Sequence, residues 1–105
     1  MKGASKVDEV LEAFNVMIED WNMMQQTSGD VGAEWAERFE KHFYEFSKQL
    51  KDWINLLQPR PMTLEEIENL PEMKKMLEIL PEPLHLNLII ELEEIIEDIE
   101  THRYD

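Results

Sequence analysis

The sequence has 105 residues and no cysteine, with 24 acidic and 10 basic side chains and a formal net charge of −14 at pH 7. The absence of cysteine excludes disulfide bonds, thiol nucleophiles and zinc–thiolate sites. The negative charge disfavours binding to nucleic acid or anionic lipid and favours basic partners. Hydrophobic residues make up 43% of the chain, which is enough for a packed core. We therefore expect a single helical domain over residues 1–105.

No segment of the sequence is typical of membrane insertion. The first ten residues, MKGASKVDEV, lack the apolar centre of a signal peptide. Apolar runs such as residues 88–90 are far shorter than the roughly 20 residues that span a bilayer. We expect a cytoplasmic protein that does not bind membranes.

The first predicted helix spans about residues 5–26. Ser5 is a candidate N-cap, with Asp8 three residues further on. Apolar residues then recur at steps of three, four and seven, which places them on one helical face: Val7, Val10, Leu11, Phe14, Ile18 and Trp21. Residues 27–32 contain glycine, serine and aspartate and predict a loop.

The second predicted helix spans about residues 33–58 and has the clearest apolar face of the chain. The residues of that face are Trp35, Phe39, Phe43, Phe46, Leu50, Trp53, Ile54 and Leu57. Because the loop before it is short, we expect the first two helices to pack as an antiparallel hairpin. Pro59 and Pro61 end this helix, since neither can donate a helical hydrogen bond.

Prolines divide the remainder into two short helices and one longer helix. Thr63 and Glu66 form a capping box that starts a helix over about residues 63–70. Pro71 begins the next one, over about residues 71–80. The last helix spans about residues 84–100, with an apolar face of Leu84, Leu88, Leu92, Ile95, Ile96 and Ile99.

These elements predict an all-α fold, a small helical bundle built on the long hairpin. Composition changes at Pro59 from aromatic-rich to aliphatic and acidic. This change marks either a hinge between two lobes or a boundary inside one bundle. In a chain of this length we expect one shared core, formed by the first, second and last helices.

No group of residues has the pattern of a catalytic, cofactor or metal site. Glu82 and His85 match half of a helical metal-binding motif, but the motif needs two copies. His42 lies on the apolar face of its helix, either as a pH-sensitive group or as a boundary histidine with one hydrogen-bond partner. No serine lies on a nucleophile-elbow motif, and no glycine-rich phosphate loop is present. We therefore predict no catalytic residues, no cofactor, no bound metal and no enzymatic activity.

The acidic face of the last helix is the first candidate interaction surface. Residues 61–105 carry 13 acidic and 3 basic side chains. Glu93, Glu94, Glu97 and Asp98 lie opposite the apolar face, with no lysine at helical spacing to neutralise them. The face is either a docking surface for a basic partner or a solvated surface without a partner.

A second candidate is an apolar patch away from the main faces of the hairpin. Val16 and Met23 are seven residues apart and lie roughly opposite the apolar stripe of the first helix. Tyr44 lies on the far side of the second helix. Exposed apolar patches of several hundred Å² mark interfaces in many proteins. These residues are either an interface or ordinary packing.

From these features we expect a non-catalytic protein–protein interaction module, a small acidic cytoplasmic regulator or adaptor. Its partner is a protein, either a second copy of the chain or a basic protein, and not nucleic acid or membrane. The alternative is an acidic inhibitor or nucleic-acid mimic, of phage or immunity type, that binds a basic protein.

Overall fold

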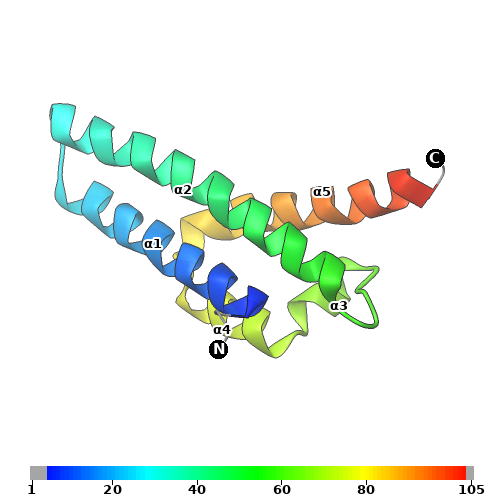
Figure 1. The fold of residues 1–105 in the computed structure, drawn as a ribbon. Coiled ribbons are helices and arrows are strands. Elements are labelled where there is room, and N and C mark those ends of the chain that lie inside the picture. The colour runs from blue at the N-terminus through cyan, green and yellow to red at the C-terminus, as the bar shows by residue number, and fades with distance from the viewer. Residues whose placement is uncertain (1–4, 104–105) are drawn as a thin grey trace. The chain divides into compact units, whose positions relative to one another are not determined.

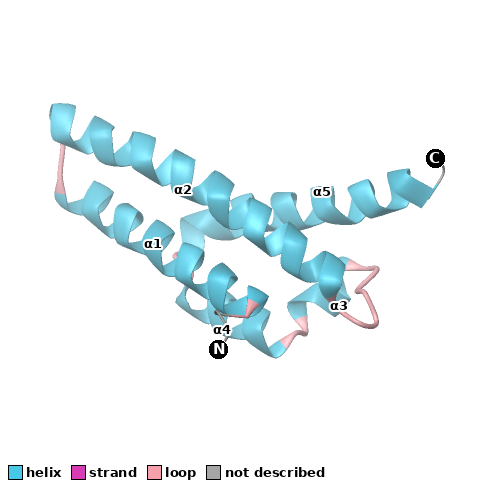
Figure 2. Ribbon diagram, viewed as in Figure 1, coloured by secondary structure: helices cyan, strands magenta, loops and turns pink. Residues whose placement is uncertain are grey.

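The computed structural model describes residues 5–103 and the side chains of residues 5–97. Within that range the chain forms helices and loops and no strand (Figure 2), which confirms the predicted all-α class. The chain divides into two compact units, an N-terminal unit of residues 1–56 and a C-terminal unit of residues 57–105. A core shared by the first, second and last helices would join these units and stays a prediction.

The N-terminal unit is an antiparallel hairpin of two long helices, α1 (Lys6–Gln26) and α2 (Gly29–Leu56), which lie side by side (Figure 1). Ser5 caps α1, as the sequence predicts, because its hydroxyl accepts a hydrogen bond from the backbone N–H of Asp8. The predicted hairpin is therefore confirmed, with the first helix in its expected position.

Aromatic side chains form much of the hairpin interior. Phe14 of α1 and Phe46 of α2 are both buried, and their ring centroids are 5.6 Å apart. Towards the turn, Trp21 contacts Phe39 at 5.7 Å between centroids, and these two rings are only half-buried. The aromatic rings of the interior are thus fully buried in the middle of the hairpin and partly exposed to solvent near the turn. Other buried apolar side chains of the unit are Val10, Met17, Leu50, Trp53 and Ile54.

The predicted loop over residues 27–32 is wrong, because α2 begins at Gly29 and only Thr27 and Ser28 lie between the helices. Gly29 has a φ of +62°, in the left-handed region that residues with a Cβ rarely adopt, so the chain reverses sharply there. The Thr27 hydroxyl donates a 2.7 Å hydrogen bond to the carbonyl of Met23 and closes the end of α1. At its other end α2 finishes at Leu56, two residues before the predicted end.

The C-terminal unit contains α3 (Leu64–Glu68), α4 (Pro71–Ile79), a 3₁₀ turn (Glu82–Leu84) and α5 (His85–Arg103). Thr63 caps α3 as predicted, and its hydroxyl accepts from the N–H of Glu66 at 3.1 Å. The Glu66 carboxylate accepts from the N–H of Met62 at 2.7 Å. In a standard capping box this carboxylate bonds to the cap residue itself, so the box here extends one residue further back.

Buried aliphatic and methionine side chains form the interior of the C-terminal unit. They are Ile67 of α3, Met73 and Met76 of α4, Leu80, Leu84 of the 3₁₀ turn, and Leu88, Leu92 and Ile95 of α5. Nε2 of the His85 ring donates a hydrogen bond to the backbone carbonyl of Leu80. Leu80 is the residue that caps the C-terminal end of α4. The last helix differs from its predicted span, because a 3₁₀ turn containing Pro83 precedes it and the helix continues to Arg103.

Candidate interaction surfaces

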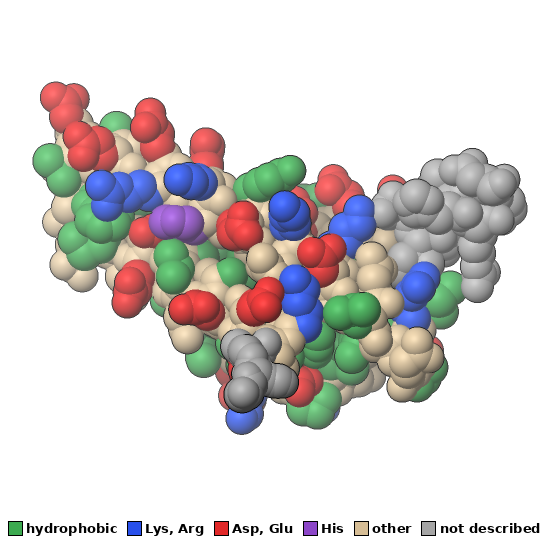
Figure 3. Space-filling model, in the orientation of Figure 1, with side chains coloured by type: hydrophobic (Ala, Val, Ile, Leu, Met, Phe, Trp, Pro, Cys, Tyr) green, Lys and Arg blue, Asp and Glu red, His purple; other side chains and the backbone are tan. Residues whose placement is uncertain are grey.

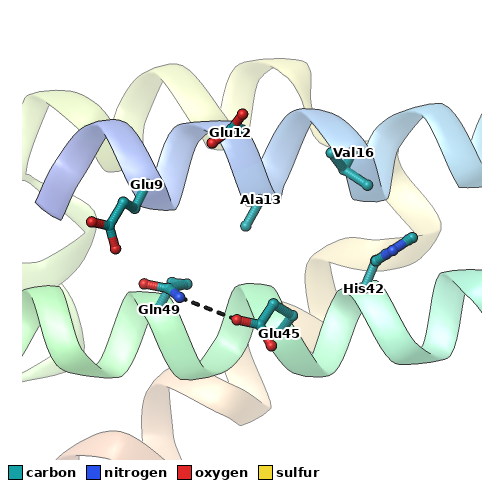
Figure 4. Close-up of a pocket in the computed structure, with 7 residues that line it drawn as sticks. All are labelled: Glu9, Glu12, Ala13, Val16, His42, Glu45 and Gln49. Atoms are coloured by element: carbon teal, nitrogen blue, oxygen red, sulfur yellow. Dashed lines mark hydrogen bonds between the residues drawn. The ribbon is translucent and has the colours of Figure 1, made fainter. Parts of the chain in front are cut away.

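A groove of about 290 Å³ lies between the two helices of the N-terminal unit. Both helices contribute side chains to it (Figure 4). The lining residues are Glu9, Glu12, Ala13 and Val16 from α1, and His42, Glu45 and Gln49 from α2. Ala13 and Val16, both from α1, are the hydrocarbon side chains of the lining.

Three carboxylates also line the groove, two from α1 and one from α2. Glu9, Glu12 and Glu45 are exposed to solvent. On the face drawn in Figure 3, acidic and basic side chains are interspersed, with a histidine and apolar side chains between them. Among the described residues, Glu12 has no hydrogen bond or ion pair, and Glu45 accepts one bond from Gln49 at 3.1 Å.

One end of the groove holds a cation of the chain itself. The ammonium group of Lys6 donates to the Gln49 side-chain oxygen at 2.8 Å. It also lies 3.3 Å from a Glu9 oxygen and 3.7 Å from an Asp52 oxygen. These partners belong to both helices, so Lys6 links the two across this end.

The other end of the groove is formed by His42, which the buried carboxylate of Asp20 holds in place. Nδ1 of His42 hydrogen-bonds to Oδ2 of Asp20 across the hairpin. Asp20 is 4% exposed, whereas about a third of the His42 side chain is exposed. Because an ionised carboxylate can only accept, Nδ1–H is the donor of this hydrogen bond. His42 therefore lies at the boundary of the hairpin with one hydrogen-bond partner, and the pH-sensitive role expected as the alternative stays a prediction.

The second candidate surface lies on α5, in the C-terminal unit. Leu86 is 67% exposed and Ile90 is 44% exposed, and Glu93 and Glu97 are exposed as well. These four residues follow one another at steps of four, three and four, so they form one line along the helix. We call them the α5 stripe. The buried residues Leu88, Leu92 and Ile95 lie on the opposite side of α5.

The carboxylates of this helix are not neutralised within the described part of the chain. Glu93, Glu94 and Glu97 have no ion pair or hydrogen bond to a described side chain. The α5 stripe therefore has an apolar half at its start and an acidic half towards its end that no described side chain neutralises.

The residues singled out from the sequence occupy different places. Val16 lines the groove, Met23 is half-buried near the turn, and Tyr44 is 73% exposed and is not part of the groove lining. Asp98 lies in α5, but its side chain is outside the described residues. A role for Val16, Met23 and Tyr44 in binding stays a prediction.

Two features were missed by the sequence reasoning. The carboxylates of the groove, with Asp20 behind His42, come together only because the hairpin is antiparallel and pairs residues far apart in the chain. Leu86 and Ile90 carry a clearer signal, since they are four residues apart and lie off the apolar face of α5. That spacing alone was sufficient to identify an exposed apolar pair.

No model of a known protein family, no curated protein and no solved structure matches the chain. None of the described helices combines the length and the hydropathy needed to cross a membrane. Across residues 5–97, no three histidine, cysteine or acidic side chains are arranged to hold a metal ion.

Proposed function

We propose that the chain is a non-catalytic protein–protein interaction module that binds a basic partner through the α5 stripe. The observation that supports this function is the alignment of exposed Leu86 and Ile90 with the carboxylates of Glu93 and Glu97, which have no partner among the described side chains. A single exposed leucine is common on protein surfaces. In the α5 stripe two exposed apolar residues are followed by two carboxylates on the same side of the helix. A partner can gain contact area from the first pair and electrostatic complementarity from the second.

The pattern of the α5 stripe favours a basic partner over a second copy of the chain. In a parallel pairing of two copies, Glu93 and Glu97 would face the same carboxylates of the other copy. In an antiparallel pairing, Leu86 would face Glu97, and a carboxylate would be desolvated against an apolar side chain at a cost in free energy. A partner helix with apolar residues followed by lysine or arginine avoids both penalties.

The test compares capture of proteins from an extract of the native host by variants of the full chain. The stripe variant combines Leu86→Ser with Glu97→Lys. Its matched control combines Ile79→Ser with Glu78→Lys, because Ile79 is 60% exposed and both residues lie on α4, in the same unit. We expect a basic protein to be captured by the wild type and the control and lost with the stripe variant. Quantitative mass spectrometry of the captured proteins measures the difference.

Two results contradict this function. One is equal capture of the same proteins by the stripe variant and the wild type. The other is a dimer in light scattering that Leu86→Ser dissociates, since the stripe would then bind a second copy. Binding to a basic protein should also weaken as salt shortens the screening length from about 10 Å at 0.1 M to about 3 Å at 1 M.

The second candidate function is an acidic inhibitor or nucleic-acid mimic, of phage or immunity type, that binds a basic protein. The exposed carboxylates of Glu93, Glu94 and Glu97, which have no partner within residues 5–97, favour it. Mimicry depends on charge alone, so Leu86→Ser would leave binding unchanged and duplex DNA would compete with the chain. Loss of binding in Leu86→Ser alone separates the interaction module from the mimic. The cytoplasmic location expected from the sequence stays a prediction for both.

A further inference from the structure

We propose that the hairpin of the N-terminal unit binds a second copy of the chain through a surface next to its turn, which we call the turn face. It consists of Val16, Glu19 and Met23 on α1 and of Trp35 and Arg38 on α2. The turn face shares no residue with the α5 stripe, so it can bind independently of the function proposed for that stripe.

Helical spacing places these residues on one side of the hairpin. Val16 of α1 and His42 of α2 both line the same end of the groove (Figure 4). Met23 follows Val16 by seven residues, so it continues the groove side of α1 towards the turn. In the same way, Trp35 precedes His42 by seven residues and continues the groove side of α2.

Apolar side chains give the turn face its contact area. Met23 and Trp35 are half-buried, and Val31, which lies four residues before Trp35 on α2, is 53% exposed. Between the histidine and the turn of the hairpin, Figure 3 shows apolar and basic side chains together. Aromatic residues, methionine and arginine are enriched at protein interfaces, so the composition of the turn face is typical of a binding surface.

Two opposite charges of the turn face lack a partner inside the chain. Glu19 lies between Val16 and Met23 on α1 and is exposed. Arg38 is exposed on α2, and its guanidinium lies over the ring of Trp35, 4.7 Å from the ring centroid. Within the described residues, neither Glu19 nor Arg38 has an ion pair or a hydrogen bond. A partner therefore meets one free carboxylate on α1 and one free guanidinium on α2.

A second copy complements both of these charges at once. When two hairpins meet face to face about a two-fold axis that runs along the helices, α1 of each copy lies over α2 of the other. The contact between Trp21 and Phe39 places Glu19 within about one helical turn of the level of Arg38. Glu19 of each copy then comes within reach of Arg38 of the other copy, and the ion pair forms twice.

Other partners match the turn face less well. A partner with charge of one sign would meet like charge at either Glu19 or Arg38. Two copies also form four helices whose neighbours are antiparallel, as in a four-helix bundle. Glu12 and Glu45 of the groove lie further from the turn along their helices. We therefore expect a contact limited to the part next to the turn, and a weak dimer.

The test measures the molar mass of the full chain by sedimentation equilibrium between about 10 μM and about 1 mM, a range that covers weak dimers. We expect the mass to rise from that of a monomer towards that of a dimer. Arg38→Glu and Glu19→Arg each turn both ion pairs into like-charge contacts, so each should raise the Kd of the dimer by about tenfold. The double variant Glu19→Arg with Arg38→Glu restores opposite charges and should regain the dimer.

Lys48→Glu is the matched control for these variants. It makes the same change in charge as Arg38→Glu, at an exposed position of α2 outside the turn face, so it should leave the Kd unchanged. The substituted positions are all exposed, so the fold is retained, and circular dichroism verifies it.

Four results would overturn the proposed dimer: a monomer over the whole concentration range, an unchanged Kd in both single variants, a double variant no more associated than the single ones, or an equal loss in Lys48→Glu. A dimer that Leu86→Ser dissociates and the turn-face variants leave intact would also overturn it. Protein capture by the stripe variant does not involve the turn face, so failure here and failure of the proposed function are measured separately.

Discussion

Asp20 and His42 form a hydrogen bond that joins the two helices of the hairpin. Asp20 is the one charged residue buried within the described part of the chain, at 4% exposure, and His42 faces it from α2. A buried carboxylate is stable only when its oxygens find donors, because desolvation of an unpaired charge is costly. The Asp20 carboxylate of α1 therefore keeps this hydrogen bond only while α2 holds His42 beside it.

The first prediction concerns this pair. His42→Leu removes the donor and leaves the Asp20 carboxylate buried without it, so we expect a loss of about 1–3 kcal/mol in the free energy of unfolding. Urea unfolding followed by circular dichroism measures the change.

The control for this prediction is the double variant Asp20→Leu with His42→Leu. It removes the buried charge together with its donor, so it should be less destabilised than the sum of the two single variants. If the stability loss of the double variant equals the sum of the losses of the two single variants, the two side chains do not interact in solution.

The second prediction compares two aromatic residues two positions apart on α2. Phe46 is fully buried against Phe14, whereas Tyr44 is 73% exposed. Phe46→Ala should lower the free energy of unfolding by about 3–5 kcal/mol through lost burial and a cavity. Tyr44→Ala should change it by less than about 0.5 kcal/mol. Thermal unfolding of both variants is the measurement, and a large loss in Tyr44→Ala would contradict the exposed position of that ring.

If Phe46→Ala does not fold, Phe46→Leu provides the same comparison with a smaller loss in the free energy of unfolding. It retains most of the hydrophobic volume and should lose less than about 1.5 kcal/mol.

The fold was largely predictable because helical periodicity and capping are local properties of the sequence. Phe14 and Phe46 were both assigned to apolar faces by spacing alone, and both are buried. Thr63 was identified as a cap from its own chemistry and from Glu66 three residues later. Such features depend on residues within one or two turns, so they can be recognised without knowledge of the tertiary packing.

The candidate surfaces were less predictable because they depend on residues brought together by the fold. Glu12 and Glu45 are 33 positions apart in the sequence, and only the register of the hairpin brings both to one groove. Asp20 lies three residues after buried Met17, but carboxylates are almost never buried unless they are paired, and its partner His42 is distant in the sequence. The predicted length of the turn was wrong for another reason. The turn is short because Gly29 adopts a positive φ, and composition alone does not determine that angle.

The third prediction concerns the cap of α3. Thr63→Ala removes the hydroxyl that accepts from the N–H of Glu66, and a five-residue helix has few other bonds to hold it. We expect a loss of about 1 kcal/mol in stability, whereas Thr63→Ser should retain the bond and lose much less. Urea unfolding of the two variants distinguishes the hydroxyl from the methyl group, and equal losses would show that capping is not the cause.

The fourth prediction separates two glycines at the start of α2. Gly29 has a φ of +62°, so an alanine there would be forced into the left-handed region at a cost of about 1–2 kcal/mol. Gly32 has ordinary helical geometry, and a Cβ there would lie 3.4 Å from the backbone carbonyl of Thr27, at the limit of normal contact. Alanine is favoured over glycine by about 1 kcal/mol in a helix, so Gly32→Ala should be neutral or slightly stabilising.

Both variants add one methyl group at the start of α2, and the added Cβ at Gly29 has no neighbour within 4 Å, so a loss there reports the backbone angle. We expect the melting temperature of Gly29→Ala to fall and that of Gly32→Ala to remain or rise. Gly29→Asn should lie between Gly29→Ala and the wild type, because asparagine tolerates the left-handed region better than alanine does. Equal melting temperatures for Gly29→Ala and Gly32→Ala would show that the chain does not reverse at Gly29. The longer loop predicted from composition would then be the correct description of the turn.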